Sequence, residues 1–336
     1  MGGATVVAAT SPKQQDVWSR REVPAVEQVA EGVWALPVPV KRNPIRFTYA
    51  YVIRVGSEVV LIDPGATSAE GEQALVDGFR GIGIPLHSLT GIVITHYHFD
   101  HWEAADALVR RTGAWMAIGF EEQTWIDRLT DADVSSSAAA QRFRAHGVPH
   151  SRAAEFVAVE DYRYTREHVR PDILLHDGDV LPVAGASLRV LSTPGHSPGH
   201  VCIHDEAREL LFSGDHILPG ITPHIALNPF GAGDPLRQYL QSLDVVDRLG
   251  DIEALPAHEF RFSGLGARTR ELRIDVAVRL REVVDALERC PGATVWEVAS
   301  TLTWSRAWAQ FGVEAQRMAV VETAAYLAHV RSVRRP

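Results

Sequence analysis

Four side chains that can bind metal ions lie within six residues of one another in this sequence: His96, His98, Asp100 and His101. They follow residues 91–94, an apolar run typical of a strand that is buried on both faces. Side chains two apart in an extended chain share a direction, so His96 and His98 can face one ion and the next two ligands a second. A lone histidine is more often structural, but four ligands at this spacing favour a metal site. Imidazole and carboxylate together suit zinc, and also iron or manganese.

Three further residues of the same chemical types follow apolar runs later in the chain. His196 lies in Thr-Pro-Gly-His-Ser-Pro-Gly-His at residues 193–200, Asp215 follows Ser-Gly, and His258 follows Pro-Ala. The glycines beside His196 relax the backbone, so that its imidazole can point inward. Each signal is weak alone, but each stands where a strand is expected to end, which strengthens the interpretation as a metal site.

The chain resembles the hydrolases of the metallo-β-lactamase superfamily, whose HxHxDH signature is present from His96 to His101. The resemblance runs from about Val33 to His258 and implies an α+β fold, a four-layer αββα sandwich with the metal site along one edge of its paired sheets. It also implies two divalent metal ions and a role for seven side chains. The first ion would be held by His96, His98 and His196, the second by Asp100, His101 and His258, and Asp215 would bridge the two.

The charges of such a site explain how it would act. Two divalent ions carry four positive charges, and Asp100 and Asp215, the candidate catalytic residues, offset half of them. A water between the ions is expected to lose its proton near neutral pH and to become the nucleophile, so no serine or cysteine is required. The ions would also polarise the carbonyl under attack and stabilise the oxyanion. Zinc is the expected metal, with iron or manganese as alternatives.

Other polar and aromatic residues near these motifs have weaker signals. Asp63 matches an acid that members of the superfamily keep after an early strand, and we expect it to orient a ligand histidine. The alternative is an ordinary turn aspartate before proline. His224 is the best candidate for a substrate contact among the remaining histidines. Tyr97 and Phe99, inside the motif, either line the pocket or pack behind the metals.

Composition limits the classes of function. The chain has 336 residues, 46% of them hydrophobic and 22% charged, which is typical of a globular protein. The net charge of -9 disfavours nucleic acid as substrate. Two cysteines outside any CxxC pair exclude a disulfide framework and favour the cytoplasm. No signal peptide is recognisable, no run is long enough to cross a membrane, and no membrane partner is expected.

The periodicity predicts three regions. Residues 1–24 are expected to be a loosely held N-terminal lead-in, and residues 25–266 the catalytic domain. Within it, residues 119–172 form a largely helical insert, either a lid over the site or ordinary surface helices. Residues 267–336 are expected to form a small, mainly helical or winged-helix-like C-terminal domain. From the family resemblance alone we also expect a homodimer, formed through these helices or through the insert.

The segment 193–200 and the acid at position 215 are similar to the glyoxalase II and lactonase branches, which hydrolyse thioesters or cyclic esters. We therefore expect a hydrolase of a small-molecule thioester, lactone or ester. The main alternative is a metal-dependent endoribonuclease that holds RNA with the arginines of the C-terminal region, although a solvated helix face explains them as well. A β-lactamase is less favoured, because the commonest subclass is secreted and carries cysteine in place of Asp215. A non-catalytic binding module is disfavoured by the complete set of ligands.

Overall fold

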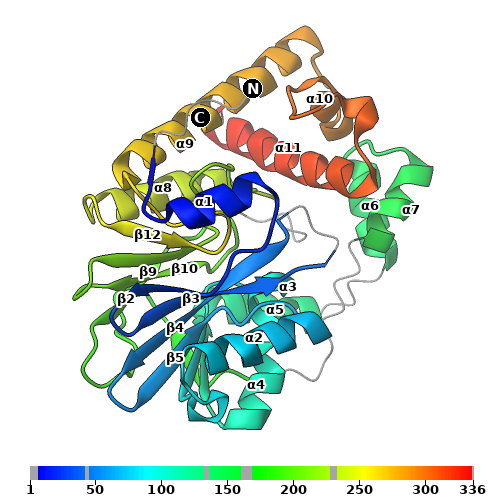
Figure 1. Ribbon diagram of the computed structural model, residues 1–336. Helices are drawn as coiled ribbons and strands as arrows, with labels where there is room; N and C mark the ends of the chain where they lie inside the picture. The colour runs from blue at the N-terminus through cyan, green and yellow to red at the C-terminus, as the bar shows by residue number, and fades with distance from the viewer. Residues whose placement is uncertain (1–6, 42–44, 132–135, 160–168, 228–232, 335–336) are drawn as a thin grey trace.

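Two β-sheets lie face to face, and helices cover both outer faces (Figure 1). The computed structural model describes residues 7–41, 45–131, 136–159, 169–227 and 233–334. Buried apolar side chains fill the space between the sheets and the space under each helical layer. The expected α+β class and four-layer sandwich with a helical C-terminal region are confirmed.

One sheet contains the central strand that leads into the histidine motif. Its strands, in spatial order, are β2 (Glu27–Ala30), β3 (Val33–Pro39), β4 (Phe47–Val55), β5 (Glu58–Ile62), β6 (Gly91–Ile94), β7 (Trp115–Gly119) and β8 (Ile173–Leu175). Strands β2 to β5 are antiparallel, and β5 to β8 are parallel. Every residue of β6 is buried, as the apolar run predicted for a strand covered on both faces.

The other sheet carries the remaining motifs. Its strands, in spatial order, are β1 (Ala8–Ala9), β13 (Phe262–Ser263), β12 (Glu253–Pro256), β11 (Leu210–Gly214), β10 (Val201–Asp205) and β9 (Leu188–Ser192). Strand β10 is antiparallel to both β9 and β11, and β11 is parallel to β12. Consequently β9, β11 and β12 all end at the same edge of this sheet.

The outer face of the first sheet is covered by α2 (Ala69–Gly81), the short helices η1 (Leu86–Ser88) and α3 (Phe99–Trp102), and α4 (Ala105–Thr112). Helix α2 begins where the Ser68 side chain accepts a hydrogen bond from the backbone of Gly71 at 2.9 Å. Gly78 of α2 allows a close approach to the sheet, because a Cβ there would lie 2.7 Å from the Leu36 side chain. This contact fixes the layer behind the histidine motif.

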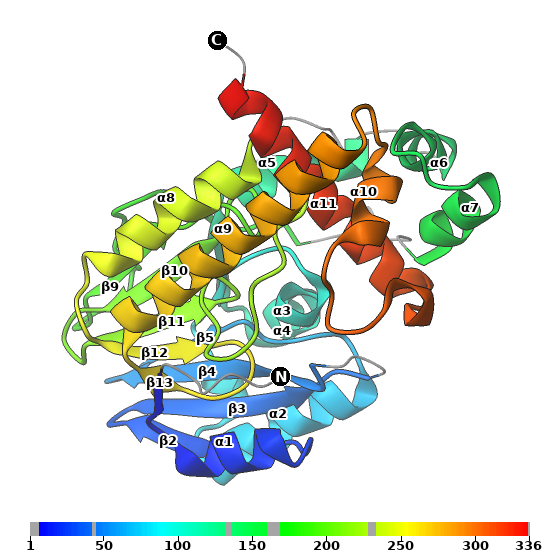
Figure 2. The ribbon, with the colours of Figure 1, turned by 90° about the horizontal axis from the view of Figure 1, so that it is seen from above.

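The second sheet is covered by α8 (Pro235–Asp247) and α9 (Leu265–Arg289), which lie side by side across it (Figure 2). Helices α10 (Val295–Thr301), η2 (Trp308–Gln310) and α11 (Val313–Arg334) follow, and the buried residues of α8 to α11 form one apolar cluster with those of this sheet. No strand follows β13 among the described residues, which favours the helical over the winged-helix alternative.

Three helices occupy the predicted insert: α5 (Phe120–Asp131), α6 (Ser136–Ala145) and α7 (His150–Val159). Buried side chains of α6 and α7 join the same apolar cluster as α9 to α11. Residues 132–135 and 160–168 of the insert lie outside the described residues. The role of the insert as a lid, and the domain boundary at residue 267, stay predictions.

The expectation of a loosely held lead-in is wrong for its described residues. Helix α1 (Pro12–Ser19) begins with Ser11 as N-cap and proline in its first turn, and β1 extends the second sheet. The backbone of Arg261 donates a hydrogen bond to Gln14 at 3.0 Å, and Ser11 donates one to Glu27 at 2.7 Å. These partners are distant in sequence, so local periodicity could not reveal them.

None of the described helices combines the length and the apolar character that crossing a membrane requires. The cytoplasmic location expected from the cysteine usage stays a prediction.

We predict that Leu272→Ala lowers the free energy of unfolding by about 2–5 kcal/mol, because it leaves a cavity in the apolar cluster that α9 shares with the second sheet. Val278→Ala on the same helix, at a side chain that is 56% exposed, should change it by less than about 0.5 kcal/mol. Urea denaturation followed by far-UV circular dichroism measures both. Equal effects of the two substitutions, or a separate transition lost only in Leu272→Ala, would show that the C-terminal helices do not depend on the sheet.

Candidate metal centre

The seven side chains predicted as metal ligands gather where four strands end. His96 and His98 follow β6, and the adjoining helix α3 contains Asp100 and His101. The remaining three follow β9, β11 and β12, and they are His196, Asp215 and His258 respectively. Because β9, β11 and β12 leave their sheet at one edge, close to the end of β6, residues that are far apart in sequence meet there, such as His96 with His196 and Asp100 with His258.

Backbone hydrogen bonds join the two sheets at this edge. The Val201 amide donates to the Thr95 carbonyl at 3.0 Å, and the Tyr49 amide donates to the Ala257 carbonyl at 2.8 Å. Gly214 is needed at the end of β11, because a Cβ there would lie 2.6 Å from His200 Nε2 and its φ of +49° disfavours other residues. The edge is therefore a fixed frame for the side chains that it carries.

Three imidazole nitrogens converge in the first cluster. His96 Nε2 lies 2.9 Å from His98 Nδ1 and 3.3 Å from His196 Nε2, and the last two are 3.0 Å apart. Asp215 Oδ2 lies 3.4 Å from His196 Nε2. Burial, reinforced by neighbouring histidines, holds the pKa of His96 and His98 well below its usual range, so both are neutral and offer lone pairs.

The second cluster combines two imidazoles with carboxylates. Asp100 Oδ2 lies 3.8 Å from His101 Nε2 and 3.6 Å from His258 Nε2. Asp215 reaches this cluster too, with Oδ2 3.7 Å from His101 Nε2 and Oδ1 3.1 Å from His258 Nε2. Asp215 is thus the carboxylate that lies near imidazole nitrogens of both clusters, and a bridging role for it stays a prediction.

The atoms that face the centre of the site have the character of ligands without partners. His101 Nε2, His258 Nε2 and Asp215 Oδ1 are buried and make no hydrogen bond of ordinary geometry among the described residues. Although burial lowers the pKa of His101, the nearby carboxylates, Asp100 first, raise it well above its usual range. Buried atoms in a field this negative fit a divalent cation, whose charge and coordination would satisfy them.

Four of the five histidines are oriented by a hydrogen bond from Nδ1, which leaves Nε2 directed into the site. His196 donates to the His224 carbonyl at 2.9 Å, and His258 donates to the Phe47 carbonyl at 3.0 Å. The other two, His101 and His96, are held through Asp63. This set of bonds selects one tautomer for each ring.

Asp63 connects the two clusters from behind. Its Oδ2 accepts from His101 Nδ1 at 2.8 Å and from the Thr95 hydroxyl at 2.7 Å, while its Oδ1 accepts from the Thr95 amide at 2.8 Å. The same hydroxyl accepts from His96 Nδ1 at 3.1 Å. Asp63 therefore contacts His101 directly and His96 through the Thr95 hydroxyl, and its role in orienting metal ligands stays a prediction. Its φ of +53° is a conformation that aspartate and asparagine adopt more readily than most residues.

The three predicted substrate contacts differ in how they lie. The Tyr97 ring contacts His98, with centroids 4.8 Å apart, and packs partly against the core under α2 and α4. Phe99 is 39% exposed. The His224 imidazole donates to the Met318 carbonyl of α11 at 3.1 Å, and only its own carbonyl contacts the ligand set. A substrate contact by any of the three stays a prediction.

Sequence reasoning missed two buried residues at the site. His200 accepts a hydrogen bond from the Asp215 amide at 3.2 Å and pairs with the Thr193 hydroxyl at 2.8 Å. Glu122 of α5 accepts a hydrogen bond from the Ser197 hydroxyl, and burial raises its pKa to about 8 despite that bond. The repeat Gly-His-Ser-Pro-Gly-His was a signal for His200, but nothing in the sequence near Glu122 marks it.

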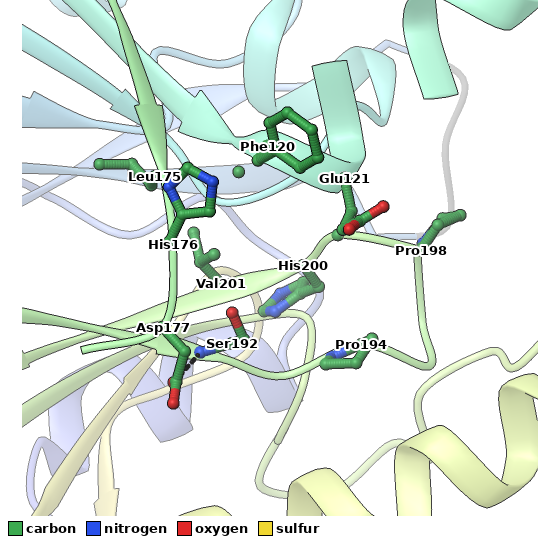
Figure 3. A pocket seen from close by; sticks show the side chains of 12 residues that line it. Phe120, Glu121, Leu175, His176, Asp177, Ser192, Pro194, Pro198, His200 and Val201 are labelled. Carbon is green, nitrogen blue, oxygen red and sulfur yellow. Dashed lines mark hydrogen bonds between the residues drawn. The ribbon is translucent and has the colours of Figure 1, made fainter. Parts of the chain in front are cut away.

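A small cavity of about 130 Å³ lies beside this site rather than in it. Its lining includes Phe120, His176, Pro198 and His200, and none of the seven predicted ligands (Figure 3). Asp177 accepts a hydrogen bond from the Ser192 amide at its rim, at 2.9 Å. The cavity therefore marks the flank of the segment that bears His196 and is not the metal centre.

Comparison with known proteins places these features in a family. The profile described as "Metallo-beta-lactamase superfamily" matches residues 43–258, which include all seven side chains. The chain is 27% identical over 274 residues to the "Lactamase-like protein adaB" of Aspergillus niger, covering 80% of this chain and 67% of that protein. It is 26% identical over 272 residues to the "Acyl-coenzyme A thioesterase MBLAC2" of Gallus gallus, covering 76% of this chain and 87% of that protein.

A solved structure agrees over most of the chain. The metallo-beta-lactamase family protein TTHA1429 from Thermus thermophilus superimposes with a TM-score of 0.75 and is 27% identical in sequence. The match covers 91% of this chain and 95% of that structure. Most of the fold described above therefore occurs in another protein of the family.

We predict that Asp63→Asn lowers the free energy of unfolding by about 1–3 kcal/mol, because an amide nitrogen cannot accept the bonds that one carboxylate oxygen now accepts. Asparagine tolerates the positive φ, so the loss reports on these hydrogen bonds. Urea denaturation of metal-free protein measures it, with Asp77→Asn on the exposed face of α2 as control. A stability equal to that of the control would contradict the orienting role.

Proposed function

Because this chain belongs to the metallo-beta-lactamase superfamily and is a hydrolase of that superfamily, we propose that it hydrolyses small-molecule acyl thioesters with a dinuclear metal centre. The observation that carries the proposal is the pair of adjacent ligand clusters that share Asp215. Each cluster offers at least three donor atoms within 4.8 Å of one another. If this edge served only structural hydrogen bonding, so many buried imidazole nitrogens and carboxylate oxygens would not point toward one another.

In this proposal the seven side chains form two metal positions. His96, His98 and His196 would hold the first ion, Asp100, His101 and His258 the second, and Asp215 would contact both. Five imidazoles and two carboxylates are the ligands that zinc prefers, and iron or manganese would also accept them. Asp100 and Asp215 would offset half of the four positive charges, leaving a net positive centre.

When bound, the two ions supply Lewis acidity that activates water and polarises a carbonyl. The chain's own residues position and tune the site. Asp63 and the carbonyls that accept from His196 and His258 keep each imidazole turned toward the centre. The buried surroundings of His96 and His258 exclude bulk water, so the charges that remain act more strongly on the substrate.

A thioester as the substrate class is supported by the chicken protein named acyl-coenzyme A thioesterase, which aligns with 76% of this chain. Lactones and oxygen esters remain the nearest alternatives, because the same attack on a carbonyl opens them. We keep the expected cytoplasmic location and the homodimer as parts of the proposal.

The ribonuclease alternative loses support from the arginines of α9. Arg273 pairs with Asp244 at 2.7 Å, and Arg279 pairs with Glu282 at 2.7 Å. Arg268 is buried and donates to the carbonyls of Leu218 and Ile221. These three side chains are engaged within the protein, and the acidic net charge further disfavours a phosphate backbone as ligand.

We predict that purified protein binds close to two zinc ions per chain and that Asp100→Ala binds one, because only the second cluster depends on this carboxylate. The substitution should lower kcat/KM by about 100-fold or more. Elemental analysis and steady-state kinetics measure the two effects, with Asp77→Ala as the control for loss of an exposed acid. Full activity in Asp100→Ala with a single ion would contradict the dinuclear mechanism.

A substrate panel tests the class of reaction. We predict that acyl-coenzyme A thioesters are hydrolysed with a kcat/KM at least tenfold above that for lactones, oxygen esters or a β-lactam, and that RNA is not cut. A chelator should abolish the hydrolysis, and added zinc should restore it. Cleavage of RNA by protein that ignores every acyl substrate would overturn the proposed function.

A further inference from the structure

Helix α5 presses against the two loops that carry the first ligand cluster. Glu122, in its first turn, is fully buried and accepts a hydrogen bond from the hydroxyl of Ser197, the residue after His196. The backbone amides of Gly199 and Tyr97 lie close to its carboxyl group and counter part of the rise in its pKa that burial causes, although Oε2 makes no hydrogen bond of ordinary geometry among the described residues. Tyr97 lies between the ligands His96 and His98, so one carboxyl group contacts both loops.

Two glycines make this approach possible. A Cβ at Gly199 would lie 2.2 Å from the Glu122 amide nitrogen, and a Cβ at Gly119 would lie 2.3 Å from the Gly199 carbonyl. Gly119 ends β7, and α5 begins at the next residue. The helix therefore rests directly on residues 197–199, and the backbone around Glu122 has no room to shift toward them.

The first cluster needs such a contact, because its parts come from different sheets. His96 and His98 follow β6 of one sheet, whereas His196 follows β9 of the other. Their three nitrogens lie 2.9–3.3 Å apart, so a small relative shift of the loops would separate them. Beside the backbone bond from Val201 to Thr95, Glu122 is a side chain that contacts both loops at once.

We propose that Glu122 is a positioning residue that clamps the Tyr97 and Ser197 loops together and so sets the affinity of the first metal position. Glu122 does not itself touch that position. The proposal rests on the metal-dependent function proposed above, and it assigns a role in the centre to a residue of the insert. Burying this carboxyl group costs free energy, and the hydrogen bond from Ser197 offsets part of that cost.

The neighbouring residue provides a matched control. Glu121 is exposed and lines the cavity near Pro198, whereas Glu122 is buried (Figure 3). Glu121→Ala removes an acid from the same turn of α5 without touching the clamp. Glu122→Gln keeps an oxygen that can accept from Ser197, and Ser197→Ala removes the donor alone.

The experiment measures zinc affinity by competition with a chromophoric chelator, alongside thermal unfolding of the metal-free proteins. Glu122→Ala should weaken one of the two zinc ions by about 10- to 100-fold, as loss of a residue behind a ligand typically does. Ser197→Ala should weaken the same ion, Glu122→Gln should fall between it and the wild type, and Glu121→Ala should change nothing. Excess zinc should restore thioester hydrolysis in Glu122→Ala.

A double variant identifies the ion. Asp100→Ala is expected to retain only the first ion, and adding Glu122→Ala should then leave less than one zinc per chain. If Glu122→Ala does not fold, Ser197→Ala and Glu122→Gln decide the question alone. Folded variants that bind both ions as the wild type does, or lose affinity for both equally, would overturn the clamp. Wild-type protein that binds no zinc would instead overturn the proposed function, and the clamp with it.

Discussion

The cost of burying negative charge is the constraint on which the rest of this structure depends. Asp63, Asp100 and Asp215 are all buried within contact of one imidazole, that of His101. Ionised carboxylates so close together and so far from water repel one another strongly unless positive charge lies among them. The surrounding fold must therefore keep these carboxylates apart, with room for a cation between them, because closer contact between them would raise the free energy of the folded state.

The order and direction of the strands bring these side chains to one edge of the sheet. The connection between β11 and β12 makes these strands parallel, so the acid after one and the histidine after the other leave at the same edge. Antiparallel pairing through β10 brings the end of β9 to that edge as well. The helices α8 and α9 then pack on the outer face of this sheet.

The clustering of the candidate ligands could be predicted from sequence because each of them follows the end of an expected strand. The apolar run before His96 is short, rich in β-branched residues and preceded by a glycine, which favours a strand over a helix. Glu122 and helix α1 could not be recognised in this way. Their partners lie 75 residues away for Glu122 and 247 for Gln14 of α1, and no local pattern encodes a contact across that distance. The positive φ at Asp63 could not be predicted either, because an ordinary turn aspartate before proline has the same sequence.

The three buried acids at this edge, Asp63, Asp100 and Asp215, differ in how readily they could bind a metal ion, because different hydrogen-bond donors surround them. Both oxygens of Asp63 already accept hydrogen bonds, from Thr95 and His101, so Asp63 is less available to bind an ion. Asp100 accepts only a long bond from the Thr48 hydroxyl, at 3.3 Å, and Asp215 Oδ1 accepts none of ordinary geometry among the described residues. The donors around each carboxylate therefore decide whether it orients a ligand or acts as one. The same residue type can serve in either role, and what separates the two is whether the neighbouring backbone and hydroxyl groups have satisfied it.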